Sequence, residues 1–256
     1  DFSYEVSRSL AACDGAVLVV DATQGVEAQT VSNALLAMNA NLEIVPAINK
    51  IDLPSADVER VKGEIEEGLA IPCDDACMVS GKTGVGIHDL LETIVRDIPA
   101  PTGDPDAPLK ALILDSYFDA YRGVVALIRV VDGCIRTGDR IRFMATGLSI
   151  EVEEVGVRRP ANTPLHDLGV GEVGYLVTGI KDPLQIRVGD TVTSDRTPAA
   201  EPLPGYREVK PMVFTGLFPI DTEDFENLRD ALDKLSLNDP AIVYTPETSV
   251  ALGFGF

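Results

Sequence analysis

Apolar runs and helical patterns alternate along the first third of the chain. Three short runs are apolar almost without interruption, as buried parallel strands are, and each precedes a stretch with apolar residues at helical spacing. This alternation predicts a parallel sheet covered by helices, in a first domain that spans residues 1–98. The strands are expected at residues 15–21, 43–49 and 76–80, and the helices at residues 28–38, 56–67 and 87–97.

A proline-rich stretch ends this pattern. Pro99, Pro101, Gly103, Pro105 and Pro108 predict a stiff, solvated linker at residues 99–108. Short apolar strands with intervening turn signals follow, which predicts a small antiparallel barrel at residues 109–198. Its strands are expected at residues 111–115, 123–131, 140–144, 151–157, 174–178 and 191–193, with turns at Asp132-Gly133 and Gly138-Asp139.

The pattern changes again after a second proline-bearing stretch at residues 198–205. Residues 209–218 alternate like a strand, and a helix with one apolar face follows, with Asp221 as its expected N-cap. Residues 241–244 return to extended structure. Strand, helix and strand predict the start of an α+β domain at residues 205–256. The whole is therefore expected to be a multi-domain α/β and β protein.

Composition excludes several classes of protein. The four cysteines Cys13, Cys73, Cys77 and Cys134 are unevenly spaced and have no histidine cluster beside them, so neither a disulfide framework nor a zinc site is expected. No apolar run approaches the roughly 20 residues that span a bilayer, so we expect no transmembrane segment. A net charge of −20 disfavours general nucleic-acid coating but leaves room for a small basic patch.

The most informative motif is Asn49-Lys50-Ile51-Asp52, which closes the second predicted strand. The carboxyl edge of a parallel sheet is where such folds bind ligands. The Asp52 carboxylate can accept hydrogen bonds from the ring N–H and the exocyclic amine of guanine, whereas adenine places an acceptor there. The Asn49 amide can contact the other edge of the base, and the Lys50 stem can lie along its face. The motif therefore predicts a guanine site.

A second segment, Ser80-Gly81-Lys82, follows the third predicted strand and strengthens this interpretation. One of its backbone N–H groups can reach the base carbonyl, and Lys82 can pack over the other face of the base. With Thr83 the segment also suggests a phosphate loop, but that motif requires a glycine where Ala76 stands. The two segments are expected to form one guanine pocket.

Beyond these motifs, several segments resemble the LepA family of translational GTPases, also called elongation factor four. Residues 1–10 look like the segment that follows the family's Asp-x-x-Gly switch motif, and residues 123–133 with Gly138-Asp139 look like the second-domain barrel of translation factors. Residues 210–219, 234–239 and 251–256 look like the LepA third domain. The fold implied is the C-terminal half of a P-loop GTPase, a translation-factor β-barrel and the start of a ferredoxin-like domain.

The resemblance also implies an activity, cofactors and partners. The intact protein would bind GTP or GDP with Mg²⁺, hydrolyse GTP on the ribosome, contact rRNA, ribosomal proteins and tRNA, and promote back-translocation. It would be cytoplasmic and ribosome-associated, with peripheral attachment to the cytoplasmic face of the inner membrane as a further expectation. The nucleotide contacts would fall on Asn49, Lys50, Ile51, Asp52, Ser80, Gly81 and Lys82.

No catalytic residue is expected in this chain. The phosphate loop, the switch threonine, the switch aspartate and the histidine after it would all precede residue 1, and the LepA-specific C-terminal domain would follow residue 256. The chain alone is therefore expected to be an inactive fragment. His88 and His166 are expected at the surface. Two alternatives stay open: a neighbouring translation GTPase such as the translocase, and a ribosome-binding module that needs no nucleotide.

Overall fold

The computed structural model describes residues 3–182, 185–204, 213–236 and 242–256. The chain divides into two compact units, Asp1–Pro101 and Thr102–Phe256, and each has its own apolar core. The division falls inside the proline-rich stretch expected to be a linker. The boundaries of the barrel at residues 109–198 and of the third domain at residues 205–256 stay predictions.

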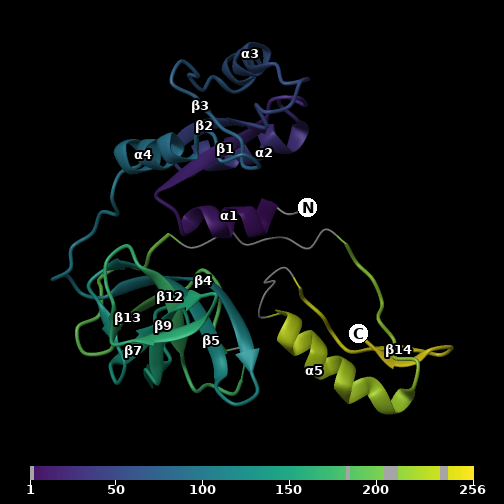
Figure 1. Cartoon of the computed structure of the whole chain (residues 1–256). Helices are drawn as coiled ribbons and strands as arrows, with labels where there is room; N and C mark the ends of the chain where they lie inside the picture. Colours follow the sequence, from purple (N-terminus) through teal and green to yellow (C-terminus); the bar gives the residue numbers. More distant parts are fainter. Residues whose placement is uncertain (1–2, 183–184, 205–212, 237–241) are drawn as a thin grey trace. The chain divides into compact units, whose positions relative to one another are not determined.

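The first unit is a three-stranded parallel sheet with helices, as predicted (Figure 1). The strands pair in the order β1-β2-β3. The elements are α1 (Ser3–Ala11), β1 (Gly15–Asp21), α2 (Ala28–Asn39), β2 (Glu43–Asn49), α3 (Val58–Leu69), β3 (Cys77–Met78) and α4 (Ile87–Asp97).

Two features of this unit differ from the prediction. Helix α1 was not expected. Strand β3 is shorter than the predicted residues 76–80, because the chain turns back on itself after Val79. The Val79 N–H still donates to Ile48 O at 2.8 Å, but the Ser80 N–H donates to Val85 O at 2.9 Å instead of continuing the ladder.

Successive side chains of the strands alternate between two cores, one on each face of the sheet. Val20 and Ile48 pack with Ile65 of α3 on one face. Ala47 packs near Leu90 of α4 on the other face. Because apolar side chains and helices occupy both faces, the polar residues that follow each strand gather at the carboxyl edge of the sheet.

The second unit is built on an antiparallel sheet (Figure 1). Its eight strands pair in the order β10-β9-β12-β5-β4-β13-β7-β8, and β6 and β11 pair separately. The strands are β4 (Lys110–Asp119), β5 (Gly123–Asp132), β6 (Ile135–Arg136), β7 (Arg140–Phe143), β8 (Ser149–Glu151), β9 (Glu154–Arg159), β10 (Ala161–Leu165), β11 (Asp167–Leu168), β12 (Val173–Val177) and β13 (Thr191–Ser194).

The core of this sheet explains why its main strands were predictable. Ile113, Ile128, Phe143, Leu168 and Leu176 are all fully buried in one cluster. The predicted strand at residues 151–157 is instead divided between β8 and β9. The short strands β6, β10 and β11 were not predicted, since they carry little apolar periodicity.

The C-terminal part contains the predicted helix and a short hairpin. Its elements are the 3₁₀ turn η2 (Thr222–Asp224), α5 (Phe225–Ser236), β14 (Glu247–Ser249) and β15 (Gly253–Gly255). The ring of Phe225 stacks on that of Phe256, with centroids 4.8 Å apart. Asp221 makes no side-chain capping bond, contrary to expectation, because the helix begins through η2.

The two strands predicted around this helix are not found where they were expected. Residues 209–212 and 241 lie outside the described residues. Residues 213–218 and 242–244 form no regular strand. Leu217 nevertheless exchanges two backbone hydrogen bonds with Phe256, of 2.7 and 2.9 Å, so the segment is tied to the end of the chain. In the described residues no helix combines the length and apolarity that crossing a bilayer requires.

Candidate functional site

The two predicted segments meet at the carboxyl edge of the parallel sheet. In the register of β1 and β2, Asp21 lies opposite Asn49, so both residues end their strands at this edge. Ala22 continues the contact, because its N–H donates to Asn49 O at 2.8 Å. Ser80 follows β3 at the same edge. The sheet therefore places Asp21 beside the motif residues, although no sequence motif had singled it out.

The Asn49 side chain joins the two segments. Its Oδ1 accepts hydrogen bonds from the Lys50 N–H at 2.8 Å and from the Gly81 N–H at 3.1 Å. The amide oxygen is thus used within the protein, which leaves the Nδ2 group to serve as a donor toward a ligand. The prediction that the segments form one site is consistent with this link.

Asp52 is oriented by the second segment. The Ser80 hydroxyl, which is fully buried, donates to Asp52 Oδ1 at 2.7 Å. The same hydroxyl accepts from the Thr83 N–H at 3.1 Å. Because Ser80 contacts Oδ1 only, the carboxylate keeps acceptor capacity on both oxygens. Asp52 itself is exposed, so a ligand can reach it.

Lys50 has an unusual backbone and a short ion pair. Its φ is +63°, a left-handed conformation that is uncommon for a residue with a Cβ. Its Nζ lies 2.6 Å from Asp21 Oδ2. This ammonium group holds the pKa of Asp21 well below its usual range, and hydrogen bonds from Thr23 lower it further. Asp21 in turn raises the pKa of Lys50.

The remaining predicted residues have different environments. Ile51 is partly buried and packs against the core beneath the site, so its side chain supports the loop. Gly81 and Lys82 are exposed. The Gly81 N–H already donates to Asn49, and a contact from this segment to a base carbonyl stays a prediction. His88 is exposed and the His166 side chain is 85% exposed, as expected for surface residues.

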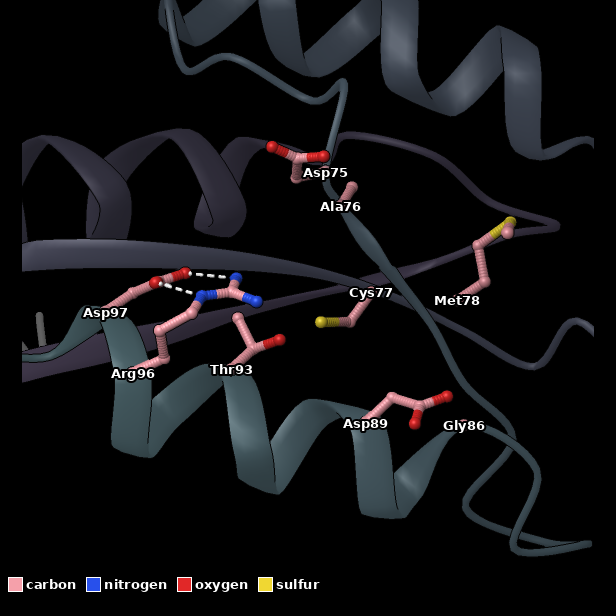
Figure 2. A pocket seen from close by; sticks show the side chains of 9 residues that line it. All are labelled: Asp75, Ala76, Cys77, Met78, Gly86, Asp89, Thr93, Arg96 and Asp97. Atoms are coloured by element: carbon pink, nitrogen blue, oxygen red, sulfur yellow. Dashed lines mark hydrogen bonds and ion pairs between the residues drawn. The ribbon is translucent and has the colours of Figure 1, made fainter.

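A cavity of about 550 Å³ lies elsewhere in the same unit, between β3 and α4 (Figure 2). It is lined by Asp75, Ala76, Cys77, Met78, Gly86, Asp89, Thr93, Arg96 and Asp97. Arg96 forms an ion pair with Asp97 and donates two hydrogen bonds to its carboxylate, of 2.6 and 2.8 Å. None of the predicted nucleotide residues lines this cavity, so its size does not locate the guanine site.

Two family models match successive parts of the chain. Residues 1–100 match the model of the Elongation factor Tu GTP binding domain. Residues 123–193 match the model of Elongation factor Tu domain 2. A GTP-binding domain followed by this second domain defines the chain as part of a GTP-binding translation factor.

Whole-chain relatives narrow the assignment. Proteins named Elongation factor 4 from Geobacillus thermodenitrificans, Bacillus subtilis and Thermosynechococcus vestitus are each 59% identical to it over all 256 residues. The chain belongs to the elongation factor 4 family, which confirms the resemblance to LepA. It spans 42% of the length of each of these relatives.

Proposed function

We propose that the protein containing this chain binds GTP and GDP through the carboxyl edge of the parallel sheet and hydrolyses GTP. The observation that carries the proposal is the joint orientation of Asn49 and Asp52 by the segment that begins at Ser80. Two loops from successive strand-helix units are thereby held as one surface. Membership of a family of GTP-binding translation factors supports the same conclusion.

Recognition of the base follows from the donors and acceptors at this surface. The Asp52 carboxylate accepts from the ring N–H and the exocyclic amine of guanine, and Ser80 fixes its orientation beforehand. Asn49 Nδ2 donates to the opposite edge of the base. The Lys50 stem covers one face of the ring, and Lys82 covers the other. Adenine is not bound, because it has neither the ring N–H nor the exocyclic amine that would donate to Asp52.

Phosphate chemistry is not assigned to these residues. The 256 residues contain no Gly-x-x-x-x-Gly-Lys-Ser/Thr sequence, which is the motif that cradles the β and γ phosphates. Among the described residues no group of three acidic, histidine or cysteine side chains could hold a metal ion. We therefore propose that these residues supply base recognition and that they do not hydrolyse GTP alone.

The proposed cellular role is that of the family. The intact protein acts on the ribosome in the cytoplasm, where it contacts rRNA, ribosomal proteins and tRNA and promotes back-translocation during elongation. Relatives named Elongation factor 4 support the translational role. We do not propose attachment to the inner membrane, because the names of these relatives give no support for it.

Calorimetric titration tests base recognition directly. The 256-residue chain is titrated with GDP and with ADP in the presence of Mg²⁺, and in parallel with the full-length protein. We expect GDP to bind both proteins, more weakly to the chain, and ADP to bind neither. Equal affinity of the full-length protein for GDP and ADP would contradict the proposal. Loss of all binding by both would favour the ribosome-binding module that needs no nucleotide.

A further inference from the structure

Asp21 is the most constrained charged residue near the guanine site, and the base contacts proposed above do not use it. Its Oδ1 accepts hydrogen bonds from the Thr23 N–H at 2.8 Å and the Thr23 hydroxyl at 2.7 Å. Its Oδ2 lies 2.6 Å from Lys50 Nζ. Both oxygens are therefore engaged, one by its own loop and one by the lysine of the motif.

The loop that follows Asp21 is itself tied to helix α3 and to the residue that caps it. The Asp57 N–H donates to Ala22 O at 2.9 Å, and Arg60 Nη2 donates to Thr23 O at 3.2 Å. Glu64 Oε2 accepts from the Val26 N–H at 2.9 Å. Two contacts from the helix and one from its N-cap residue thus hold the loop that follows Asp21, and with it the Thr23 partner of the carboxylate, before any ligand arrives.

Lys50 is much less constrained by its surroundings. Its side chain is 52% exposed, against 15% for Asp21. A half-exposed lysine loses considerable rotamer freedom when its stem must lie against a base. The ion pair restricts that freedom in advance, so less entropy is lost on binding.

We propose that Asp21 is a positioning residue for the guanine site: it holds Lys50 Nζ so that the lysine stem is already in place to pack against the face of the base. The inference rests on the proposed function and adds to it a division of roles. Asp52 selects the base, whereas Asp21 adds to the affinity for any base that is accepted. Asp21 does not touch the nucleotide and acts only through Lys50.

The test uses the full-length protein and measures its affinity for GDP and for xanthosine diphosphate. Asp21→Asn keeps an oxygen for Thr23 but removes the charge that holds Lys50. We expect GDP to bind about fivefold more weakly, the magnitude of a modest ion pair, with the preference for GDP over xanthosine diphosphate unchanged. Lys50→Met keeps an apolar stem without the ammonium, and the double variant should be no weaker than Lys50→Met alone.

Controls separate this inference from the function on which it rests. Asp97→Asn breaks the Arg96 ion pair on α4 (Figure 2) and should leave GDP affinity unchanged. Asp52→Asn should shift the base preference. If it does so while Asp21→Asn binds GDP as tightly as wild type, the role of Asp21 is overturned and the guanine site stands. If wild type shows no preference for GDP, the proposed function fails, and the role of Asp21 fails with it. Thermal unfolding of each variant verifies that it is folded.

Discussion

The hydroxyl of Ser80 donates a 2.7 Å hydrogen bond to Oδ1 of Asp52, across 28 positions of sequence. The carboxylate that is expected to read the base is therefore oriented by a residue from the next strand-helix unit. Because Ser80 is fully buried and Asp52 is exposed, a buried hydroxyl orients an exposed carboxylate. Two predictions concern this site, and two others concern the barrel.

Asp52→Asn should change the base preference of the full-length protein from guanine to xanthine. The amide of asparagine donates where the carboxylate accepted, and xanthine presents an oxygen at that position. Competition between GDP and xanthosine diphosphate for a fluorescent nucleotide measures the preference. An unchanged preference for guanine would remove Asp52 from the site.

Ser80→Ala should weaken GDP binding about fivefold without changing the preferred base. The variant loses one hydrogen bond to Asp52, for which about 1 kcal/mol is typical, while the carboxylate itself is retained. Ser149→Ala is the matched control, since the Ser149 hydroxyl donates to Asp195 at the same 2.7 Å distance in the barrel. Equal GDP affinities of Ser80→Ala and Ser149→Ala would show that this hydrogen bond does not serve the site.

Gly123→Ala should destabilise the barrel by about 3 kcal/mol, the upper range for strained or overpacked positions. Gly123 has a φ of +75°, and an added Cβ would lie 2.2 Å from Ile180 O. Gly138 has a φ of +86° but no atom within 4 Å of such a Cβ, so Gly138→Ala should cost only about 1 kcal/mol. Urea unfolding of both variants measures the difference. A Gly138→Ala variant as unstable as Gly123→Ala would mean that the close backbone contact is unimportant.

The barrel should lose stability at high pH through Tyr175. Burial, together with the Glu154 carboxylate to which its hydroxyl donates, raises the pKa of Tyr175 to about 12. In the unfolded chain a tyrosine has a pKa of about 10, so the folded state favours the neutral ring. The resulting stability is fully present below pH ~10 and is lost as pH rises toward 12.

Tyr175→Phe tests this pH dependence. The variant should lack the decline that Tyr175 causes between pH ~10 and 12, at the cost of about 1 kcal/mol at neutral pH from the lost hydrogen bond to Glu154. Denaturant unfolding at several pH values, compared with wild type, gives both quantities. Parallel pH profiles for the two proteins would contradict the assignment.

Continuous apolar runs made most of the fold predictable. Strands β1 and β2 have the predicted bounds because their side chains are needed in cores on both faces of the sheet. Helix α1 was missed, and residues 213–218 were wrongly expected to be a strand. In that segment Val213 and Phe214 are more than 80% exposed, so the alternation of apolar residues does not reflect a buried face in the described structure.

The site was predictable only in part, for a physical reason. Asn49, Lys50, Asp52 and Ser80 follow strands and could be placed at the sheet edge from their positions alone. Lys50 has a left-handed backbone and forms an ion pair with Asp21 of the neighbouring strand, and local sequence specifies neither feature. An aspartate at the end of a neighbouring strand was the only available signal, and such residues are common.

The hydrogen bond from the Gly81 N–H to Asn49 Oδ1 joins the two ends of residues 49–82, so the proposed base-recognition residues lie in one contiguous stretch of sequence. Replacing the corresponding stretch of a related GTP-binding protein with residues 49–82 should transfer their base preference, because Asp52 and Ser80, which orients it, are transferred together. Asp21 would stay behind with the host. Such chimaeras would take their base preference from the donor, while the residue that positions Lys50 would come from the recipient, so base preference and this contribution to affinity could change separately in evolution or engineering.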